Sequence, residues 1–393
     1  MKDCFIYVSQ VPRTGTAGQN KFEKGVIGSL LKKEEEEGFE IKIFSASTEK
    51  EKSESKRLVL IPLNKKTYIG FIFHQLRLLI SLGNYLWRQK KNKLHMFVRY
   101  HPAMFAPLLL TFLFNIRLTV RTGPVLPNLS FFNKNPGTIV YHCIKWVLGL
   151  FYKRASSIVT VTEKIKQWIV EAYKLDPEKI VIVPNAADTT LFFPEPPDRN
   201  KWKLPENDFV FGFVGVIFET QGLDTIIRAL GLLKNNREKV PLLFLVGDGE
   251  YRSTLQSLSE ELNIADRIIW TGNIPHEQVR SAINACDMML APFQKKSLEL
   301  KGSSALKLWE YLACDKPILA SESEDHEFLQ KFNFGRMVEP DNVELWAKAL
   351  SIEADKNDFV LQGRGERFTC EKHSYPSAVE KFISISLGPR MVH

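Results

Sequence analysis

Residues 302–321, GSSALKLWEYLACDKPILAS, read as a loop, an amphipathic helix, a break and a buried strand. At about 100° per residue, the apolar and polar side chains of this helix separate onto opposite faces. The apolar face holds Ala305, Leu308, Trp309 and Leu312, and the polar face holds Ser303, Lys307, Glu310 and Cys314. We predict Ser303 or Ser304 as the N-cap, because serine is favoured there. Pro317 ends the helix before the apolar run 318–320.

The polar face of this predicted helix suits a ligand. A helix that begins beside a strand end offers free backbone N–H groups and a positive dipole end, which favour phosphate or a diol-bearing molecule. Glu310, one turn into the helix, is placed to hold two vicinal hydroxyl groups. The alternative is an ordinary surface helix in which Lys307 and Glu310 form an i, i+3 pair.

Length and composition indicate two globular domains. A chain of 393 residues is longer than one hydrophobic core usually accommodates. A composition of 44% hydrophobic and 25% charged residues is typical of a folded protein. Five scattered cysteines without CxxC spacing favour a reducing compartment and argue against a zinc site. The N-terminal apolar run is too short for a signal peptide, and the longest apolar segment, 104–116, has thirteen residues where a spanning helix needs roughly 20. We expect a cytoplasmic protein that needs no metal.

The net charge of +8 hides an asymmetry along the chain. Residues 1–194 carry 29 Lys and Arg against 15 Asp and Glu, or +14, which leaves 24 against 30, or −6, for the remainder. Residues 55–162 contain 16 basic residues and no Asp or Glu. Such a surface predicts an anionic partner: phospholipid, nucleic acid or a phosphorylated acceptor. Two apolar helices with basic ends, 68–91 and 140–154, favour an anionic membrane surface.

The first half alternates buried strands with helices. The predicted strands are 4–8, 40–44, 58–62, 95–98, 118–120, 157–162 and 180–183, and the predicted helices are 20–31, 68–87, 140–153 and 164–173. A loop with Gly15 and Gly18 joins the first strand to a helix, as at the start of a nucleotide-binding α/β unit. Arg99 and His101 follow one strand and Arg121 another, at carboxyl ends where parallel sheets bind ligands. For His101 the alternative is a loop histidine without a role.

A linker rich in proline and charge, PEPPDRNKWKLPEND at 194–208, precedes a second run of strands and helices. The predicted strands there are 209–214, 242–246, 268–271, 288–291 and 318–320, and the predicted helices include 224–233, 252–262 and 277–285. Strands that alternate with helices imply parallel sheets covered on both faces. The sequence therefore predicts an α/β protein with two Rossmann-like parallel-sheet domains that face each other across a cleft.

Five segments, in their order along the chain, resemble the family 4 (group 1) glycosyltransferases of the GT-B architecture. They are ASSIVTVTEKIKQWIV, KIVIVPNAADTTLFFP, LFLVGDGEYRSTLQSL, DRIIWTGNIPHEQV and LKLWEYLACDKPILAS. The resemblance covers nearly the whole chain and implies sugar transfer from a nucleotide-diphosphate sugar with retention of anomeric configuration, usually without metal. It also implies an acceptor-side domain over 1–193, a nucleotide-sugar-binding domain over 209–375, and a final helix and tail over 376–393 that cross back to the first domain.

The resemblance assigns donor-binding residues one by one. Glu310 is similar to the glutamate that holds the donor ribose, and a carboxylate accepts two hydroxyl hydrogen bonds well. Gly15 and Gly18 resemble the loop whose backbone meets the diphosphate, where glycine lets N–H groups approach closely. The other donor-binding candidates are Ser303 and Ser304 at the helix start, and Gly272, Asn273 and Ile274 in the turn that lines the nucleobase.

Three positions depart from the family pattern. The family often has a second glutamate eight positions before the ribose-binding one, where this chain has Gly302. It often has arginine and lysine in the first loop of the second domain to neutralise the diphosphate, where this chain has Val216 and Gln221. The PNG of the hinge region is PNA, with Ala186.

We expect Lys307 to supply the missing positive charge to the leaving diphosphate. It lies on the same helix face as Glu310, and its flexible stem carries a point charge toward phosphate. Arg99 and Arg121 are the competing phosphate candidates, and a solvated Lys307 without a role is the alternative. The candidate catalytic residues are His101 and Lys307.

The leading hypothesis is a retaining glycosyltransferase that acts on a lipid-linked or cell-envelope polysaccharide acceptor, peripherally bound at the inner membrane face. Its expected partners are the nucleotide sugar, which is a co-substrate rather than a cofactor, the saccharide acceptor and an anionic membrane surface. One alternative is a sugar-nucleotide epimerase of the same architecture, and another is a non-catalytic nucleotide-sugar-binding protein that lost the phosphate clamp. Nucleic-acid binding is not expected, because no recognised module is present.

Overall fold

The structure is a computed structural model that describes residues 2–11, 18–33, 39–47, 53, 55–63, 68–100, 104–122, 139–236, 239–356 and 359–388. The chain forms two compact units. The first comprises Met1–Pro184 and Tyr375–His393, and the second comprises Asn185–Ser374. Each unit has a parallel sheet of its own, so the predicted α/β fold with two Rossmann-like domains is confirmed.

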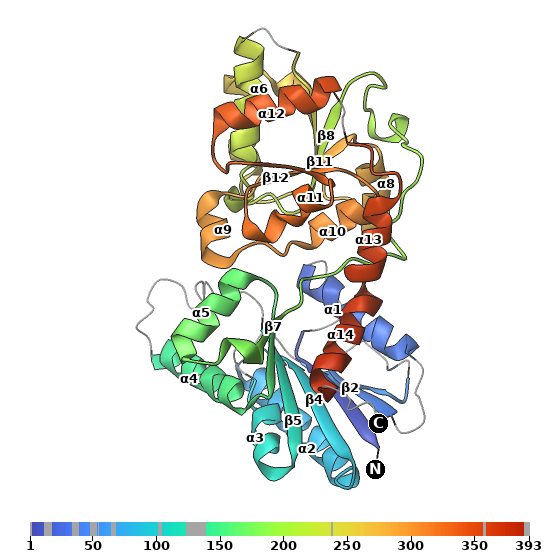
Figure 1. Ribbon diagram of the computed structural model, residues 1–393, viewed down its shortest axis with the longest axis vertical. Helices are drawn as coiled ribbons and strands as arrows, with labels where there is room; N and C mark the ends of the chain where they lie inside the picture. The colour runs from blue at the N-terminus through green and yellow to red at the C-terminus, as the bar shows by residue number, and fades with distance from the viewer. Residues whose placement is uncertain are drawn as a thin grey trace. The chain divides into compact units, whose positions relative to one another are not determined.

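The described part of the first unit contains a seven-stranded parallel sheet in the order β3-β2-β1-β4-β5-β6-β7 (Figure 1). The strands are β1 Asp3–Ser9, β2 Phe39–Ser47, β3 Leu58–Pro62, β4 Lys93–Arg99, β5 Ile116–Arg121, β6 Ser157–Thr160 and β7 Ile180–Ile182. β1 pairs with β2 and β4 over its full length, from Asp3 to Ser9. Because side chains alternate across a strand, each strand contributes to two cores.

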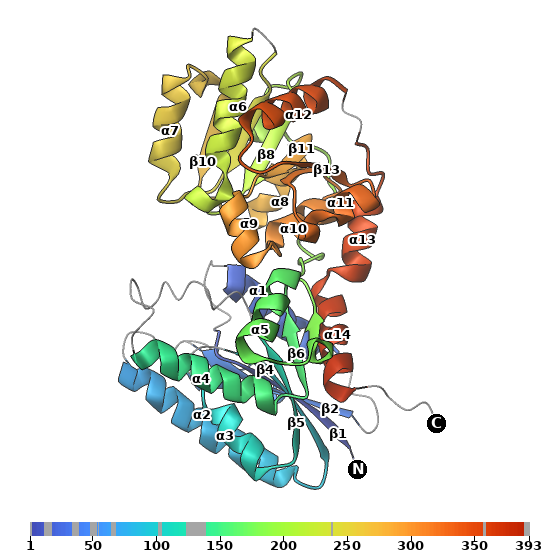
Figure 2. The same ribbon diagram turned by 60° about the vertical axis from the view of Figure 1, so that its left-hand side comes forward.

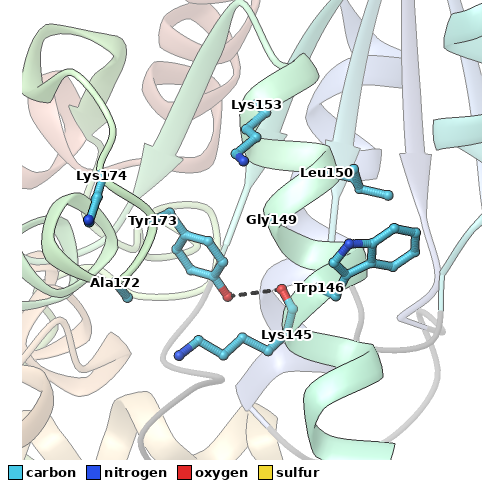
Figure 3. Close-up of a pocket in the computed structure, with 8 residues that line it drawn as sticks. All are labelled: Lys145, Trp146, Gly149, Leu150, Lys153, Ala172, Tyr173 and Lys174. Atoms are coloured by element: carbon cyan, nitrogen blue, oxygen red, sulfur yellow. Dashed lines mark hydrogen bonds between the residues drawn. The ribbon is translucent and has the colours of Figure 1, made fainter.

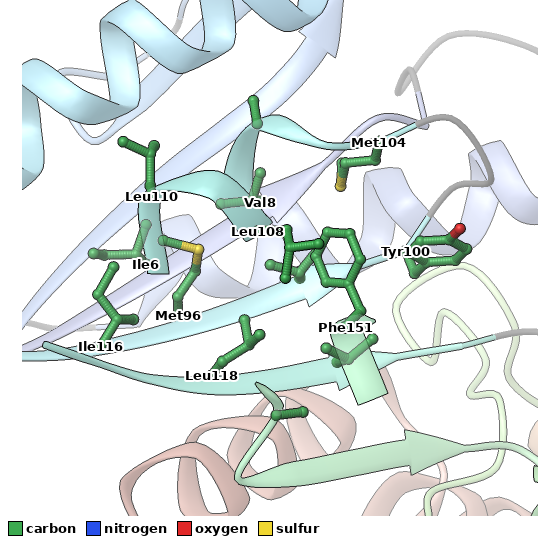
Figure 4. Close-up of a cluster of buried hydrophobic side chains, with 14 of the residues drawn as sticks. Ile6, Val8, Met96, Tyr100, Met104, Leu108, Leu110, Ile116, Leu118 and Phe151 are labelled. Atoms are coloured by element: carbon green, nitrogen blue, oxygen red, sulfur yellow. The ribbon is translucent and has the colours of Figure 1, made fainter. Parts of the chain in front are cut away.

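Helices cover both faces of this sheet. Their bounds are α1 Gly18–Lys32, α2 Tyr68–Arg88, α3 Ala106–Leu113, α4 Ile139–Arg154, α5 Glu163–Tyr173 and α14 Tyr375–Leu387. α2, α3 and α4 lie on one side of the sheet and α14 on the other (Figure 2). The core under α2, α3 and α4 contains Ile6, Met96, Leu118 and Phe151 among its buried side chains (Figure 4).

The last helix, α14, returns to the first unit and packs on α1, β1, β4 and β5. α1 approaches it closely at Gly25, where a Cβ would lie 2.0 Å from the ring of Tyr375, so only glycine fits. The ring of Phe382 packs on Phe97 of β4 with a centroid distance of 4.6 Å. These contacts hold the chain end on the sheet face opposite α2, α3 and α4.

The described part of the second unit contains a six-stranded parallel sheet in the order β10-β9-β8-β11-β12-β13. The strands are β8 Val210–Val214, β9 Leu242–Val246, β10 Ile268–Gly272, β11 Met288–Ala291, β12 Ile318–Ser321 and β13 Gly335–Val338. Its helices are α6 Leu223–Asn235, α7 Arg252–Glu261, α8 His276–Asn284, α9 Lys295–Lys301, α10 Leu306–Ala313, α11 Phe328–Lys331, α12 Val343–Lys356 and α13 Arg364–Lys372. α6, α7 and α12 cover one core, and α8, α10 and α11 cover the other.

The segment 194–208, predicted to be a linker, is packed within the second unit. The Arg199 guanidinium donates to the carbonyl of Asp208 at 2.9 Å and to the carboxylate of Asp287 at 2.6 Å. The carboxylate of Glu195 accepts from Arg280 at 2.8 Å. The unit boundary lies earlier, between residues 184 and 185, because Ala187 already pairs with Ser374.

Candidate functional site

The carboxyl end of β8 is fastened to α10. β8 lies between β9 and β11, where the strand order reverses, and open parallel sheets bind ligands at such points. Val214 donates its N–H to Tyr311 Oη at 2.9 Å, and this hydroxyl donates to the Val214 carbonyl at 3.3 Å. Burial raises the pKa of Tyr311 well above its usual value, so the hydroxyl stays protonated. These hydrogen bonds hold α10 beside the end of β8.

Two glycines keep this strand end free of side chains. Gly215 has φ +147°, and a Cβ there would lie 3.1 Å from Lys307 Nζ. Gly247 has φ +131°, and a Cβ there would lie 2.0 Å from the Gly215 carbonyl oxygen. The Gly215 N–H donates to the Val246 carbonyl at 3.0 Å, which joins the ends of β8 and β9. Glycine at these positions allows close backbone packing that no other residue permits.

The amine of Lys307 is enclosed at the same place. Its Nζ donates to Gln221 Oε1 at 2.6 Å and lies 3.8 Å from the centroid of the Phe213 ring. Burial lowers the pKa of Lys307 from 10.5 to about 7, and the negative charge of Glu310 opposes this effect. Near neutral pH the amine is therefore close to its midpoint, and a bound anion would favour the charged form.

Glu310 lies one turn after Lys307 on α10 and is partly buried rather than fully exposed. Its charge is close enough to Lys307 to influence that pKa. On the opposite side of the helix, the indole of Trp309 stacks on His373 with a centroid distance of 3.6 Å and an interplanar angle of 4°. This packing holds the turn of α10 that carries the carboxylate.

The predicted N-cap by Ser303 or Ser304 is wrong. The N-cap residue of α10 is Ala305, which makes no side-chain cap. The hydroxyl of Ser304 instead accepts from the backbone N–H of Asn185 at 2.8 Å, and the N–H of Ser303 donates to Asp325 at 2.8 Å. The Ser303 hydroxyl has no hydrogen-bond partner among the described residues. Neither serine side chain therefore caps the first N–H groups of α10.

The placement of Cys314 on the polar face is also wrong. α10 ends at Ala313, and Cys314 is buried in the core of the second unit. The chain turns there because Asp315 has φ +55° and its carboxylate accepts from the N–H groups of Gly363 and Gly365 at 2.6 and 2.9 Å. The helical wheel therefore does not apply beyond residue 313.

The predicted nucleobase turn lies at the carboxyl end of β10. Gly272 ends this strand with φ +67°, and its carbonyl accepts from the Gly247 N–H at 2.9 Å. Asn273 is exposed and Ile274 is partly buried. The structure thus brings this turn to the same sheet edge as Lys307, with β9 between them.

Two residues of the Lys307 environment were missed by the sequence reasoning. In the sequence, Gln221 indicates only that the lysine of the family pattern is absent, and Phe213 indicates only a strand. They precede Lys307 by 86 and 94 positions, so no local pattern could have linked them. The segment after β9 was quoted only for its resemblance, but its Asp248 carbonyl accepts from the Ile217 N–H at 3.0 Å and positions the loop after β8.

Arg99 and Arg121 do not lie in loops. They end β4 and β5 and pair with one another across the sheet, on the face covered by α1 and α14. Arg99 forms an ion pair with the buried carboxylate of Glu23, which also accepts from Tyr7 at 3.2 Å. The guanidinium of Arg121 lies 4.1 Å from the centroid of the Phe22 ring. Burial and the charge of Arg99 lower the pKa of Arg121 to about 9.

Three other candidate site residues, Gly15, Gly18 and His101, were predicted in loops of the first half. Gly15 and His101 lie outside the described residues. Gly18 is the first residue of α1 rather than a loop residue, since the helix begins two positions earlier than predicted.

Over the residues that the structure describes, no group of three or more His, Cys, Asp or Glu side chains is arranged to hold a metal ion. Among the same residues, no helix has the length and apolar character needed to span a membrane.

Two sequence families match the chain, one after the other. Residues 26–191 match the family described as "Glycosyltransferase Family 4". Residues 194–358 match the family described as "Glycosyl transferases group 1". Together the two matches extend over both units of the structure.

Curated relatives match parts of the chain. A D-inositol 3-phosphate glycosyltransferase of Stackebrandtia nassauensis is 28% identical over 177 residues, which are 42% of this chain and 39% of that protein. A GDP-mannose-dependent alpha-(1-6)-phosphatidylinositol monomannoside mannosyltransferase of Mycolicibacterium smegmatis is 30% identical over 149 residues, 36% of this chain and 38% of that protein. The chain thus matches less than half the length of these relatives.

Solved structures share the whole architecture. Sucrose-phosphate synthase from Thermosynechococcus elongatus has a TM-score of 0.71 at 16% identity and covers 96% of both chains. Anabaena HepE, solved with UDP, has a TM-score of 0.70 at 13% identity and covers 98% of both chains. At these identities the likeness shows the fold alone. With both family matches and this shared GT-B fold, the chain belongs to the family 4, group 1 glycosyltransferases.

Proposed function

We propose that this protein transfers a sugar from a nucleotide-diphosphate sugar to a lipid-linked or saccharide acceptor of the cell envelope, with retention of anomeric configuration. The observation that carries the proposal is the amine of Lys307, held against Gly215 at the end of β8. The carboxylate of Glu310 follows one turn later on the same helix. A cation and a carboxylate at a strand end suit a diphosphate and a ribose respectively.

Lys307 takes the place of the usual phosphate clamp in this proposal. The leaving nucleotide diphosphate gains negative charge as the glycosidic bond breaks, so a cation that meets it lowers the barrier. With a pKa near 7, the amine is easily charged when a phosphate approaches. The absence of a side chain at Gly215 leaves room beside the Lys307 amine, and the uncapped start of α10 adds N–H donors.

Glu310 holds the donor ribose in this proposal, and the turn at Gly272, Asn273 and Ile274 lines the nucleobase. The sequence and the family resemblance make Gly15, Gly18 and His101 candidates for a part in donor binding and catalysis. The reaction requires no metal, because Lys307 and backbone N–H groups neutralise the leaving group.

The acceptor is proposed from chemistry and relatives together. The Mycolicibacterium relative named above acts on a phosphatidylinositol monomannoside. WaaG, a glycosyltransferase involved in lipopolysaccharide biosynthesis, shares the fold with a TM-score of 0.64 at 16% identity over 98% of this chain and 100% of its own. A lipid-linked acceptor lies at a membrane, and the acid-free basic stretch 55–162 suits that surface. We therefore place the protein on the cytoplasmic face as a peripheral protein.

A thermal-shift panel of UDP, GDP, ADP and CMP with their sugars tests donor binding. A ligand at 100 times its dissociation constant stabilises the folded state by about 2.7 kcal/mol, which is readily measured. A shift by one nucleotide and its sugar identifies the donor class. NMR of the product anomer then tests retention. Absence of any shift across the panel would contradict the proposal.

A second candidate is a binding protein that no longer transfers sugar. Val216 and Gln221 stand where the family often has arginine and lysine, and this observation favours it. Binding of a nucleotide sugar without transfer to any glycolipid or polysaccharide acceptor would support this alternative. An epimerase of the same architecture would instead convert the bound sugar nucleotide without an acceptor.

A further inference from the structure

The outer surface of α2, α3 and α4 is unusually apolar. Of the large hydrophobic side chains that are exposed in the described part of the chain, nine lie on these three helices: Ile72, Phe73, Leu76, Ile80, Trp87, Leu109, Phe112, Leu113 and Trp146. The three most exposed are Leu113 at 75%, Trp146 at 67% and Phe112 at 66%. Exposed apolar patches of this extent mark a surface that binds another body.

α2 has two apolar faces rather than one. Leu78, Leu82 and Leu86 point into the core, as expected for a helix that covers a sheet. A second stripe points outward and consists of Ile72, Phe73, Leu76, Ile80 and Trp87. A helix that faces water carries polar residues on its outer side. The second stripe is therefore suited to an apolar environment.

Every charged residue in the three helices that form this surface is basic. Residues 55–162, which include α2, α3 and α4, contain no Asp or Glu. The exposed cations on or beside these helices include Arg77, Arg88, Lys90, Lys91, Lys93 and Lys153. An apolar surface whose own helices carry only cations is complementary to an anionic lipid surface.

A basic hollow of about 840 Å³ lies at the end of α2. Its lining includes Trp87, Lys90 and Leu113, together with Lys91, Lys93 and Arg117. The amine of Lys90 lies 4.1 Å from the centroid of the Trp87 ring. Two carboxylates near this end already have partners: Asp3 is bound by His95 at 2.9 Å, and Glu40 accepts from the Tyr85 hydroxyl of α2 at 2.8 Å. The hollow therefore offers cations beside an indole, which suits a lipid phosphate at the membrane interface.

A second hollow, of about 460 Å³, lies between α4 and α5 (Figure 3). It is lined by Trp146 and by the cations Lys145, Lys153 and Lys174. Tyr173 forms one wall and donates its hydroxyl to the Lys145 carbonyl at 3.4 Å. The two hollows repeat one combination, an exposed tryptophan with lysines around it.

We propose that the outer face of α2, α3 and α4 docks on an anionic phospholipid bilayer. Trp87 and Trp146 lie at the level of the headgroups, Phe112 and Leu113 enter the acyl boundary, and the lysines of both hollows contact lipid phosphates. This proposal rests on the proposed function, because a lipid-linked acceptor would bring the protein to a membrane. It assigns the membrane contact to one surface of the first unit.

Flotation with lipid vesicles tests the surface. The full chain should float with vesicles of phosphatidylcholine and phosphatidylglycerol, but not with phosphatidylcholine alone, and salt should weaken the binding. Lys90→Glu with Lys91→Glu should lower the partition coefficient at least about 30-fold, because each cation near the surface contributes about a fivefold factor. The matched control is Lys348→Glu, an exposed lysine of the second unit.

Phe112→Ser with Leu113→Ser tests the apolar part of the surface, with Val360→Ser, also strongly exposed but in the second unit, as its control. The Phe112 and Leu113 double variant should bind anionic vesicles at least tenfold more weakly than the parent. The control, Val360→Ser, should bind them as the parent does. Each variant should keep the parent melting temperature, because the replaced side chains are exposed. Equal flotation on neutral and anionic vesicles, or unchanged binding by both double variants, would overturn the proposal.

Two further outcomes separate this proposal from others. A dimer that the Phe112 and Leu113 variant abolishes, without any vesicle binding by the parent, would overturn it in favour of a second copy of the chain. The variants should retain the thermal shift with the donor nucleotide, since their positions lie outside the donor site. Flotation without any nucleotide shift would uphold the docking surface while contradicting the proposed function.

Discussion

Replacing Lys307 by methionine tests the proposed donor chemistry most directly. Methionine has a similar length and no charge, so it fills the space beside Phe213 and Gly215 without the amine. The hydrogen bond to Gln221 at 2.6 Å is lost, but Gln221 is partly exposed and water can replace the donor. We therefore expect Lys307→Met to fold.

The depressed pKa predicts how the stability of this variant depends on pH. The folded-state pKa of Lys307 is about 7, below the ordinary 10.5, so the unfolded chain binds more protons between these values. The parent therefore gains stability as pH rises from 7 to 10.5. At about 1.36 kcal/mol per pKa unit, the variant should be more stable than the parent by up to about 5 kcal/mol at pH 6 and about 2 kcal/mol at pH 9.

Activity should change in the opposite direction. Loss of one group that stabilises charge in the transition state typically lowers kcat by about 100- to 1000-fold. Binding of the uncharged nucleoside should hardly change, because the contribution of Lys307 grows with the charge of the leaving group. In the parent, kcat/KM should fall as pH rises through about 7, and this limb should be absent from the variant.

Single-turnover kinetics and denaturant unfolding at pH 6 and 9 measure both effects. Lys296→Met, on the exposed side of α9, is the matched control and should change neither. An unchanged kcat in Lys307→Met would refute the assignment. A stability gap between variant and parent that does not narrow from pH 6 to pH 9 would refute the reasoning about the buried amine.

Four other substitutions test the donor site and the first unit. Glu310→Gln should weaken nucleotide binding by about 1.5 to 3 kcal/mol by calorimetry, and affinity within twofold of the parent would contradict its role. Arg99→Met should lower the free energy of unfolding by about 3 to 5 kcal/mol, because it leaves the Glu23 carboxylate buried without its ion pair. Gly25→Ala should lower the melting temperature, since its Cβ would overlap a ring of α14, whereas Gly28→Ala has open space and should be neutral or stabilising. Equal melting temperatures for these two alanine variants would show that α14 does not pack on α1 as described.

Much of the fold follows from local pattern. The predicted strands 58–62, 242–246 and 288–291 coincide with β3, β9 and β11. Runs of apolar residues bounded by Gly, Pro or polar turns are sufficient to identify buried strands, because both faces of a parallel sheet are covered. The same pattern identified α2 and α4 as helices with basic ends.

Local sequence pattern was insufficient to predict the hydrogen bonds of polar groups whose partners are distant in the sequence. Ser303 and Ser304 are residue types that favour a cap, but the Ser304 hydroxyl accepts from the Asn185 N–H, and Asp325 holds the backbone N–H of Ser303. A side chain near a helix start binds whichever donor or acceptor the fold brings to it, and the sequence does not show which one that is.

Some properties of the candidate site likewise follow from the sequence alone, and others depend on the tertiary structure. The sequence by itself determined the alternating α/β order, the basic acid-free stretch and the presence of Lys307 and Glu310 on one helix face. Only the tertiary structure decided that Lys307 meets Gln221 and Phe213, that its pKa falls to about 7, and that Arg99 is committed to Glu23. Burial and long-range pairing set these properties, because the charge on a side chain depends on the atoms that surround it in space rather than on its neighbours along the chain.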